Sequence, residues 1–144
     1  MRPRAAADSL EPRAPGVNGR GSAAILGQAR DLERVLDSMT EQSLLHLRRA
    51  IRLGRYRLTE HAEHEREADT IAMHELEEAF SSANVEILED YPRDPRGPSA
   101  LFLGFTKVGR PIHAVIGLSG PAIVVVVTVY RPDSKLWKDW RIRI

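Results

Sequence analysis

The predicted core of the fold is the sequence Ala122-Ile123-Val124-Val125-Val126-Val127-Thr128-Val129-Tyr130. Its unbroken run of mostly β-branched residues ends at Arg131-Pro132-Asp133, which predicts a strand that is apolar on both faces and central in a covered sheet. The run is too short for a membrane-crossing helix, which needs roughly 18 apolar residues. Strand alternation places the odd-numbered residues 123–129 on one face and the even-numbered residues 124–130 on the other. Tyr130 is then expected at the rim of the sheet, next to solvent.

The 144 residues suit one compact domain and a tail. The chain has no cysteine, which excludes a disulfide scaffold, a thiolate metal site and a cysteine nucleophile. Arginines near the N-terminus are not followed by the apolar segment of a signal peptide. We therefore expect a cytoplasmic protein without a membrane anchor.

The net charge of +1 conceals a strong asymmetry along the chain. Residues 39–59 carry a net charge of +4, residues 60–90 carry −10, and residues 91–144 carry +6. A basic sheet could bind a polyanion such as RNA. The alternative is that the acidic segment is a solvated helix face that nearby arginines balance.

The N-terminal part divides near residue 38. Residues 1–21 are rich in Pro, Gly, Ala and Arg, which predicts disorder. Apolar residues then recur at helical spacing and indicate a short helix that ends near Ser38. Thr40 is a suitable N-cap for a second helix. We therefore predict a disordered tail with a short helix over residues 1–38 and a folded domain over residues 39–144.

The domain combines helices with a meander of strands. A short extended piece at residues 56–58 precedes a helical hairpin, 61–68 and 73–82, which turns at residues 69–71. Four strands follow, separated by turn signals, at residues 85–90, 100–106, 111–117 and 122–130. Such short connections favour antiparallel pairing. The predicted class is α+β, with N-terminal helices and the hairpin packed on a four-stranded antiparallel sheet. The tail after residue 133, which holds two tryptophans, is expected to pack back on the sheet.

Five motifs in this order resemble an uncharacterised bacterial domain family with a RelE/ParE toxin-like fold. They are His61-Ala62, Asp69-x-Ile71, Glu89-Asp90-Tyr91-Pro92, Arg110-Pro111-x-His113, and Thr128-Val129-Tyr130-x-Pro132 with Trp137. The resemblance covers roughly residues 45–138. Two positions depart from the family pattern: Asn84 replaces a common glycine, and Arg66 replaces a common methionine.

The resemblance implies a function. Genes of such proteins often lie beside those of small zinc-containing antitoxins of the MqsA type. The implied role is the toxin of a type II toxin–antitoxin pair, acting as a metal-independent mRNA endoribonuclease without a cofactor. The implied partners are RNA, as free mRNA or mRNA on the ribosome, and a cognate antitoxin protein.

Metal-independent RNA cleavage needs a base, a cation that holds the phosphate, and an acid for the 5′-oxygen. His113 should face away from its strand neighbours and could serve as base or acid. Tyr130 could donate a proton or stack on a base, and its position resembles that of a functional tyrosine in RelE-type toxins. Arg110 and Lys107 belong to the preceding basic turn and could bind RNA phosphate. Each of these side chains also has a purely structural interpretation, as a packed, hydrogen-bonded or solvated residue.

His61 is the third candidate catalytic residue. One turn before Glu65, it could act as a second catalytic group or form an i,i+4 pair with that carboxylate. His61, His64 and Glu65 could contribute metal ligands, but no second cluster completes such a site, so we expect no metal.

Two rival functions remain open from the sequence. The first is a non-catalytic module of the same fold that binds RNA or protein through the sheet. The second is a structural interaction protein whose acidic helical hairpin docks on a basic partner.

Overall fold

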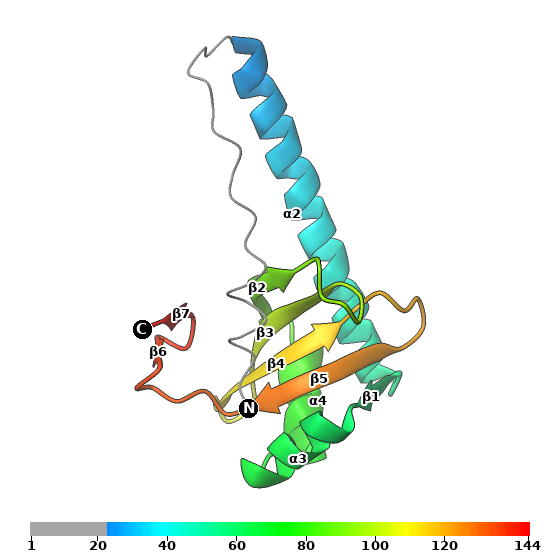
Figure 1. Ribbon diagram of the computed structural model, residues 1–144, viewed down its shortest axis with the longest axis vertical. Coiled ribbons are helices and arrows are strands. Elements are labelled where there is room, and N and C mark those ends of the chain that lie inside the picture. The colour runs from blue at the N-terminus through cyan, green and yellow to red at the C-terminus, as the bar shows by residue number, and fades with distance from the viewer. Residues whose placement is uncertain (1–22) are drawn as a thin grey trace.

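The computed structural model describes the main chain of residues 23–144 and the side chains of residues 28–34 and 40–144. The predicted disorder of residues 1–21 lies outside the described residues. The main sheet has the order β1-β5-β4-β3-β2 (Figure 1). Its strands are β1 Tyr56–Leu58, β2 Glu86–Tyr91, β3 Ser99–Phe105, β4 Pro111–Gly117 and β5 Val124–Tyr130. The predicted α+β class and the antiparallel meander from β2 to β5 are confirmed.

The prediction of four strands is wrong, because the short extended piece β1 joins the sheet as a fifth strand. It pairs in parallel with β5, with Tyr56 opposite Val124 and Leu58 opposite Val126. The parallel partner lies far along the chain, so no hairpin signal in the sequence could indicate this pairing. β5 thereby becomes an interior strand, as its apolar sequence predicts.

A β-bulge changes the predicted faces of β5. The register of β4 and β5 shifts between Val115 and Ile116, so that Val115 pairs with Thr128 while Ile116 pairs with Val126. The extra residue, Val127, breaks the alternation. Val129 therefore lies on the same face as Val124 and Val126, in the main core, and not with the odd-numbered residues as predicted.

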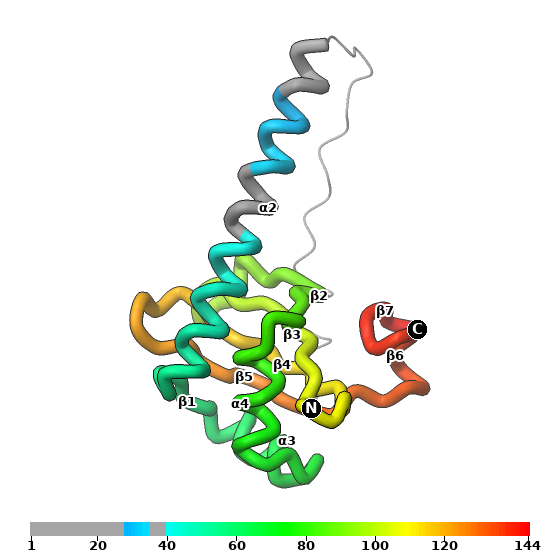
Figure 2. Tube along the Cα trace, turned by 180° about the vertical axis from the view of Figure 1, so that it is seen from behind, coloured from blue at the N-terminus to red at the C-terminus, as the bar shows by residue number. Residues whose placement is uncertain are grey.

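The helices cover one face of the sheet, which we call the helix face. They are α2 Ala23–Arg52, α3 Glu60–Ala68 and α4 Met73–Ser81. Figure 1 shows α4 behind the sheet and Figure 2, from the opposite side, shows it in front. Leu47 and Ile51 of α2 and Leu76 and Phe80 of α4 are fully buried in the core on this face. Thr59 accepts a hydrogen bond from the Ala62 N–H and caps α3, as a threonine at this position should.

The prediction of two N-terminal helices with a break near Ser38 is wrong. α2 is one helix of 30 residues, and Thr40 lies in its interior rather than at an N-cap. The residues around position 38 include no glycine or proline, so nothing stops the helix there. The first turns of α2 extend beyond the sheet (Figure 1).

The opposite face of the sheet carries the C-terminal segment, residues 133–144, which we call the cap. The cap contains a small hairpin of β6 Trp137–Lys138 and β7 Ile142–Arg143. Trp137 is 4% exposed and packs with Tyr91, Leu101 and Val115 of the sheet. The predicted return of the tail to the sheet is confirmed. None of the described helices has the length and apolar content that crossing a bilayer demands.

Candidate functional site

His113 and Tyr130 form a pair on the cap face. They are directly opposite in the β4–β5 register, and His113 Nδ1 lies 3.1 Å from Tyr130 Oη. His113 Nε2 lies 2.7 Å from the main-chain carbonyl oxygen of Trp140, in the cap. Because a carbonyl oxygen can only accept, Nε2 carries the proton, and in a neutral imidazole Nδ1 then accepts a hydrogen bond from the Tyr130 hydroxyl. The cap therefore sets the tautomer that gives His113 a basic nitrogen facing Tyr130.

The expected position of Tyr130 at a solvent-facing rim is wrong. Tyr130 is 2% exposed and His113 is 0% exposed. The ring of Trp137 meets the His113 ring edge to face, with centroids 4.6 Å apart. The predicted direction of His113, away from Ile112 and Ala114, is confirmed, since both neighbours lie in the core on the helix face. The cap, rather than solvent, covers this end of β5.

A strained turn in the cap presents the carbonyl group that binds His113. Asp139 and Trp140 have φ angles of +52° and +61°, which place two successive residues in the left-handed region. This conformation is costly for a bulky side chain and persists only where the surroundings hold it. Trp140 is held in this way by the contact between its carbonyl group and His113.

Two arginine–glutamate pairs fasten the cap to β2. Arg141 donates to Glu86 at 2.9 and 2.7 Å, and Arg143 donates to Glu89 at 2.7 and 2.9 Å. The hydrogen bonds from Arg141 lower the pKa of Glu86. Burial alone would raise the pKa of Glu89, but hydrogen bonds from Arg143 and Tyr91 outweigh it, and the pKa is lowered. Both carboxylates therefore remain charged well into the acidic range.

Arg110 and Lys107 contact α4 on the helix face. The Arg110 guanidinium lies 3.4 Å from Glu75, and the main-chain N–H of Lys107 donates to Glu78 at 3.0 Å. Arg110 is still half-exposed, with 54% of its side chain open to solvent. The predicted cationic turn therefore lies beside acidic side chains of the helical hairpin, whereas His113 and Tyr130 lie under the cap.

Glu75 also binds Arg131, the residue that follows Tyr130. Arg131 Nη2 lies 2.9 Å from Glu75 Oε1, and its guanidinium donates to the carbonyl oxygens of Asp69 and Thr70. Burial would raise the pKa of Glu75, but hydrogen bonds from the Ala72 N–H and from Arg131 lower it. The motifs around Asp69 and Arg131 thus hold the turn of the helical hairpin against the end of β5.

His61 forms the i,i+4 pair with Glu65, which was one of the two alternatives for this residue. Its Nε2 lies 3.1 Å from Glu65 Oε1, and its side chain is 47% exposed. Within the part of the chain that the structure describes, no three His, Cys, Asp or Glu side chains gather as metal ligands. His61 is therefore placed on α3 in contact with its own helix, whereas His113 and Tyr130 meet on the sheet.

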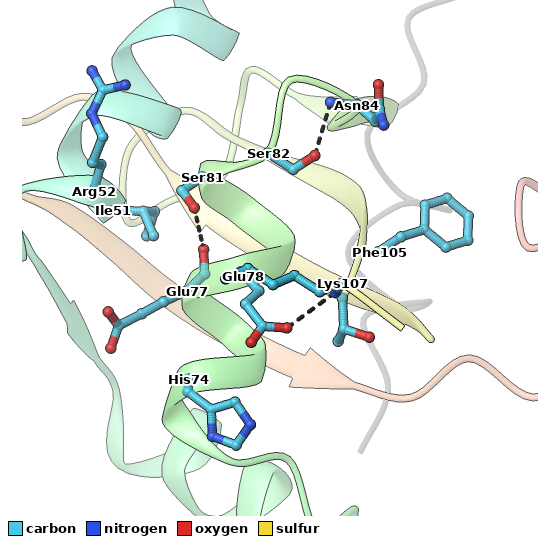
Figure 3. A pocket seen from close by; sticks show the side chains of 11 residues that line it. Ile51, Arg52, His74, Glu77, Glu78, Ser81, Ser82, Asn84, Phe105 and Lys107 are labelled. Carbon is cyan, nitrogen blue, oxygen red and sulfur yellow. Dashed lines mark hydrogen bonds between the residues drawn. The ribbon is translucent and has the colours of Figure 1, made fainter. Parts of the chain in front are cut away.

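A wide groove of about 730 Å³ runs between α2, α4 and the β3–β4 turn (Figure 3). Arg52 and His74 lie toward opposite ends of it, and Glu78 is engaged with the main chain of Lys107. Ser81 donates to the Glu77 carbonyl group at 2.6 Å. The charged and polar groups that Figure 3 draws do not converge on one point, so the groove offers a binding surface rather than an acid–base site.

One set of side chains was not singled out from the sequence. It comprises Arg48, Arg49, Arg52, Arg55 and Arg57, at the end of α2, in the turn that follows it and on β1. They account for the positive charge of residues 39–59, which was the available signal. The sequence pattern could not show that no ion pair would join these arginines to a carboxylate of the described residues.

Comparison with known protein families identifies the chain. The model of a domain of unknown function (DUF4258) matches residues 58–131, just over half of the chain. The chain therefore belongs to this family, and the predicted membership of an uncharacterised domain family is confirmed. Comparisons with curated proteins and with solved structures found no match.

Proposed function

We propose that this member of the DUF4258 family has a RelE/ParE-like fold and is the toxin of a type II toxin–antitoxin pair that cleaves mRNA without a metal ion. The observation that carries the proposal is the contact of His113 Nδ1 with Tyr130 Oη, 3.1 Å apart on the face of the sheet that the helices leave to the cap. An imidazole and a phenol in contact can pass a proton to and from a substrate. The helical hairpin beside an antiparallel meander supports the fold assignment.

The chemistry follows from the two groups. As Tyr130 takes the proton of an RNA 2′-hydroxyl, it passes its own proton to His113 Nδ1, and the 2′-oxygen attacks the adjacent phosphorus. The bond from phosphorus to the 5′-oxygen breaks, and the His113 imidazolium returns its proton through Tyr130 to that oxygen. The products are a 2′,3′-cyclic phosphate and a 5′-hydroxyl, so protons and electrons balance.

Burial of the pair sets a condition on this activity. His113 is 0% and Tyr130 2% exposed, so RNA can reach them only when the cap moves away from the sheet. The cap is attached mainly by the packing of Trp137, by two arginine–glutamate pairs and by the contact of His113 with Trp140. These attachments involve few residues, which is typical of segments that open locally while the core stays folded.

The same burial favours a second candidate function. If the cap stays in place, His113 and Tyr130 are structural, and the domain is a non-catalytic module that binds RNA or a protein through its exposed surfaces. Exposed cations such as Arg110 and Lys107 remain available to this module.

Induced expression of the full chain in a bacterial host separates the two functions. Wild type is compared with His113→Ala, Tyr130→Phe and the matched control His61→Ala, with growth and total mRNA integrity followed at equal soluble protein level. Growth arrest with mRNA loss, relieved at His113 or Tyr130 but not at His61, is the result expected of a ribonuclease. Normal growth and intact mRNA with abundant folded wild-type protein would favour the binding module.

A further inference from the structure

Five arginines lie close together in the sequence, from the last turns of α2 to the edge strand β1. This arginine surface consists of Arg48, Arg49, Arg52, Arg55 and Arg57. No aspartate or glutamate occurs between Glu41 and Glu60. All but Arg48 are exposed, and β1 is the outermost strand of the sheet, so this surface lies at an open edge of the molecule.

The arginine surface is not neutralised within the described part of the chain. Elsewhere arginines such as Arg66, Arg131 and Arg141 lie within 3 Å of a carboxylate oxygen. No ion pair joins a carboxylate of the described residues to any arginine of the surface. In addition, Arg48 Nε is buried without a hydrogen-bond partner there. A buried guanidinium donor without an acceptor is costly. Arg66 Nε and Arg131 Nη1 are buried in the same way, so the case for an outside partner rests on the uncompensated charge of the five arginines.

The helix dipole explains only part of this charge. Arg49 and Arg52 occupy the last turn of α2, where cations balance the partial negative charge of the helix C-terminus. Arg55 and Arg57 lie beyond the helix and cannot act in this way. The helix terminus carries about half of an elementary charge, far less than five guanidinium groups supply.

A small pocket of about 200 Å³ lies within this surface. Arg49 and Arg55 line it together with His46, and no carboxylate does. His46 Nε2 lies 3.1 Å from the carbonyl oxygen of Gly120, so the imidazole ties α2 to the β4–β5 loop that forms the far wall. Two guanidinium groups beside one shallow pocket suit a phosphate group, which the planar fork of arginine binds through paired hydrogen bonds.

The surface also reaches the cap face. Tyr56 and Leu58 pack toward the core of the helix face, so Arg57 between them projects to the opposite face, beside Val125. From Val125 to Tyr130, β5 covers about 17 Å at 3.3 Å per residue. A strand of RNA held by the arginines could thus continue along β5 toward the His113–Tyr130 pair.

We propose that the arginine surface binds the phosphate backbone of RNA, without base recognition, as a contact surface separate from the His113–Tyr130 pair. The choice of RNA rests on the proposed function, whereas the binding itself does not depend on cleavage. An acidic protein segment is the competing occupant. Among the described residues no carboxylate pairs with these arginines, and the cations are spread from α2 to β1, which favours an extended polyanion with regularly repeated charges.

Fluorescence anisotropy with a labelled single-stranded RNA oligonucleotide tests the proposal over a series of salt concentrations. The full-length wild type is compared with a variant carrying Arg49→Gln, Arg52→Gln, Arg55→Gln and Arg57→Gln. The matched control removes four exposed cations elsewhere, at Arg30, Arg93, Lys135 and Lys138. His113→Ala is also measured, because the proposed function predicts that this variant cannot cleave RNA. If it binds the RNA as wild type does, binding by the arginine surface is tested independently of cleavage.

The slope of log K against log salt should become shallower by about 2.8 in the first variant, because each phosphate that an arginine no longer neutralises reduces the slope by about 0.7. The control slope should stay near that of wild type. Equal slopes in the two variants, or no wild-type binding at low salt, would overturn the proposal. Displacement of the RNA by a poly-glutamate peptide at lower concentration than by unlabelled RNA would also overturn it and identify an acidic protein segment as the occupant.

Discussion

Replacing Gly104 with alanine should lower the stability of the domain by more than would be expected from the addition of one methyl group. Gly104 lies in β3 opposite Ile112, on the helix face, where α4 crosses the sheet. A Cβ atom built there would lie 2.5 Å from the Ala79 carbonyl oxygen and 2.8 Å from its carbonyl carbon. These are main-chain atoms of α4, so no side-chain rotation relieves the overlap and the helix itself must shift.

Overpacking of this kind typically costs 1–3 kcal/mol, and we expect about 3 kcal/mol because a whole helix must yield. At about 4 °C per kcal/mol for a domain of this size, Tm should fall by roughly 12 °C. Gly117→Ala is the matched control, since the nearest atoms to its added Cβ lie at 3.8 and 3.9 Å. Urea and thermal unfolding measure both. A loss below about 1 kcal/mol in Gly104→Ala, or equal losses in the two variants, would refute the close packing of α4 on β3.

Three further predictions concern the contacts around the candidate site. Arg131→Met should lower the free energy of unfolding in urea by about 3 kcal/mol, because it removes charged hydrogen bonds and leaves the Glu75 carboxylate with less paired positive charge. Arg110→Met, at an exposed side chain, should lower it by less than about 1 kcal/mol. Trp137→Ala should speed proteolytic removal of residues 133–144 while the sheet stays protected, because Trp137 packs the cap on the sheet. Removal of these residues at the same rate from the variant and from wild type would contradict this prediction. The free energy of unfolding should hold from neutral pH to about 4.5 and then decline as the pH falls through the lowered pKa values of four carboxyl groups in the folded chain. The reason is that these groups bind protons at a higher pH in the unfolded chain than in the folded chain. The carboxyl groups concerned are Glu75, Glu86, Glu89 and Asp94. A stability that rises between pH 5 and pH 3 would contradict the last prediction.

The sequence predicted correctly those elements that depend on neighbouring residues alone. Turn residues and β-branched runs located the four strands of the meander, and β4 Pro111–Gly117 matches its predicted bounds. Strand alternation predicted the direction of His113, because β4 is regular at that position. The resemblance singled out Tyr130, which lies directly opposite His113.

Features that depend on contacts distant in sequence were missed. The bulge at Val127 has no signature in a run of valines, so the reversal of faces before Val129 could not be foreseen. Nor could the burial of Tyr130, because it depends on where residues 133–144 return to the sheet. Because Arg110 is close to His113 in the sequence, we expected the two side chains to lie together. Arg110 lies instead on the β3–β4 turn and forms an ion pair with Glu75 of α4.

We propose that His113 and Tyr130 are a ribonuclease pair under a cap that can move away from the sheet. Cleavage of a single-stranded RNA by the purified full chain in the presence of EDTA tests this proposal. Wild type is compared with Arg141→Gln/Arg143→Gln, which loosens the cap, and with the same double variant carrying His113→Gln. We expect faster cleavage when the cap is loosened, loss of cleavage with His113→Gln, and no cleavage of a 2′-O-methylated RNA. Absence of cleavage in both the wild type and the folded, cap-loosened variant would show that the pair is not a ribonuclease site.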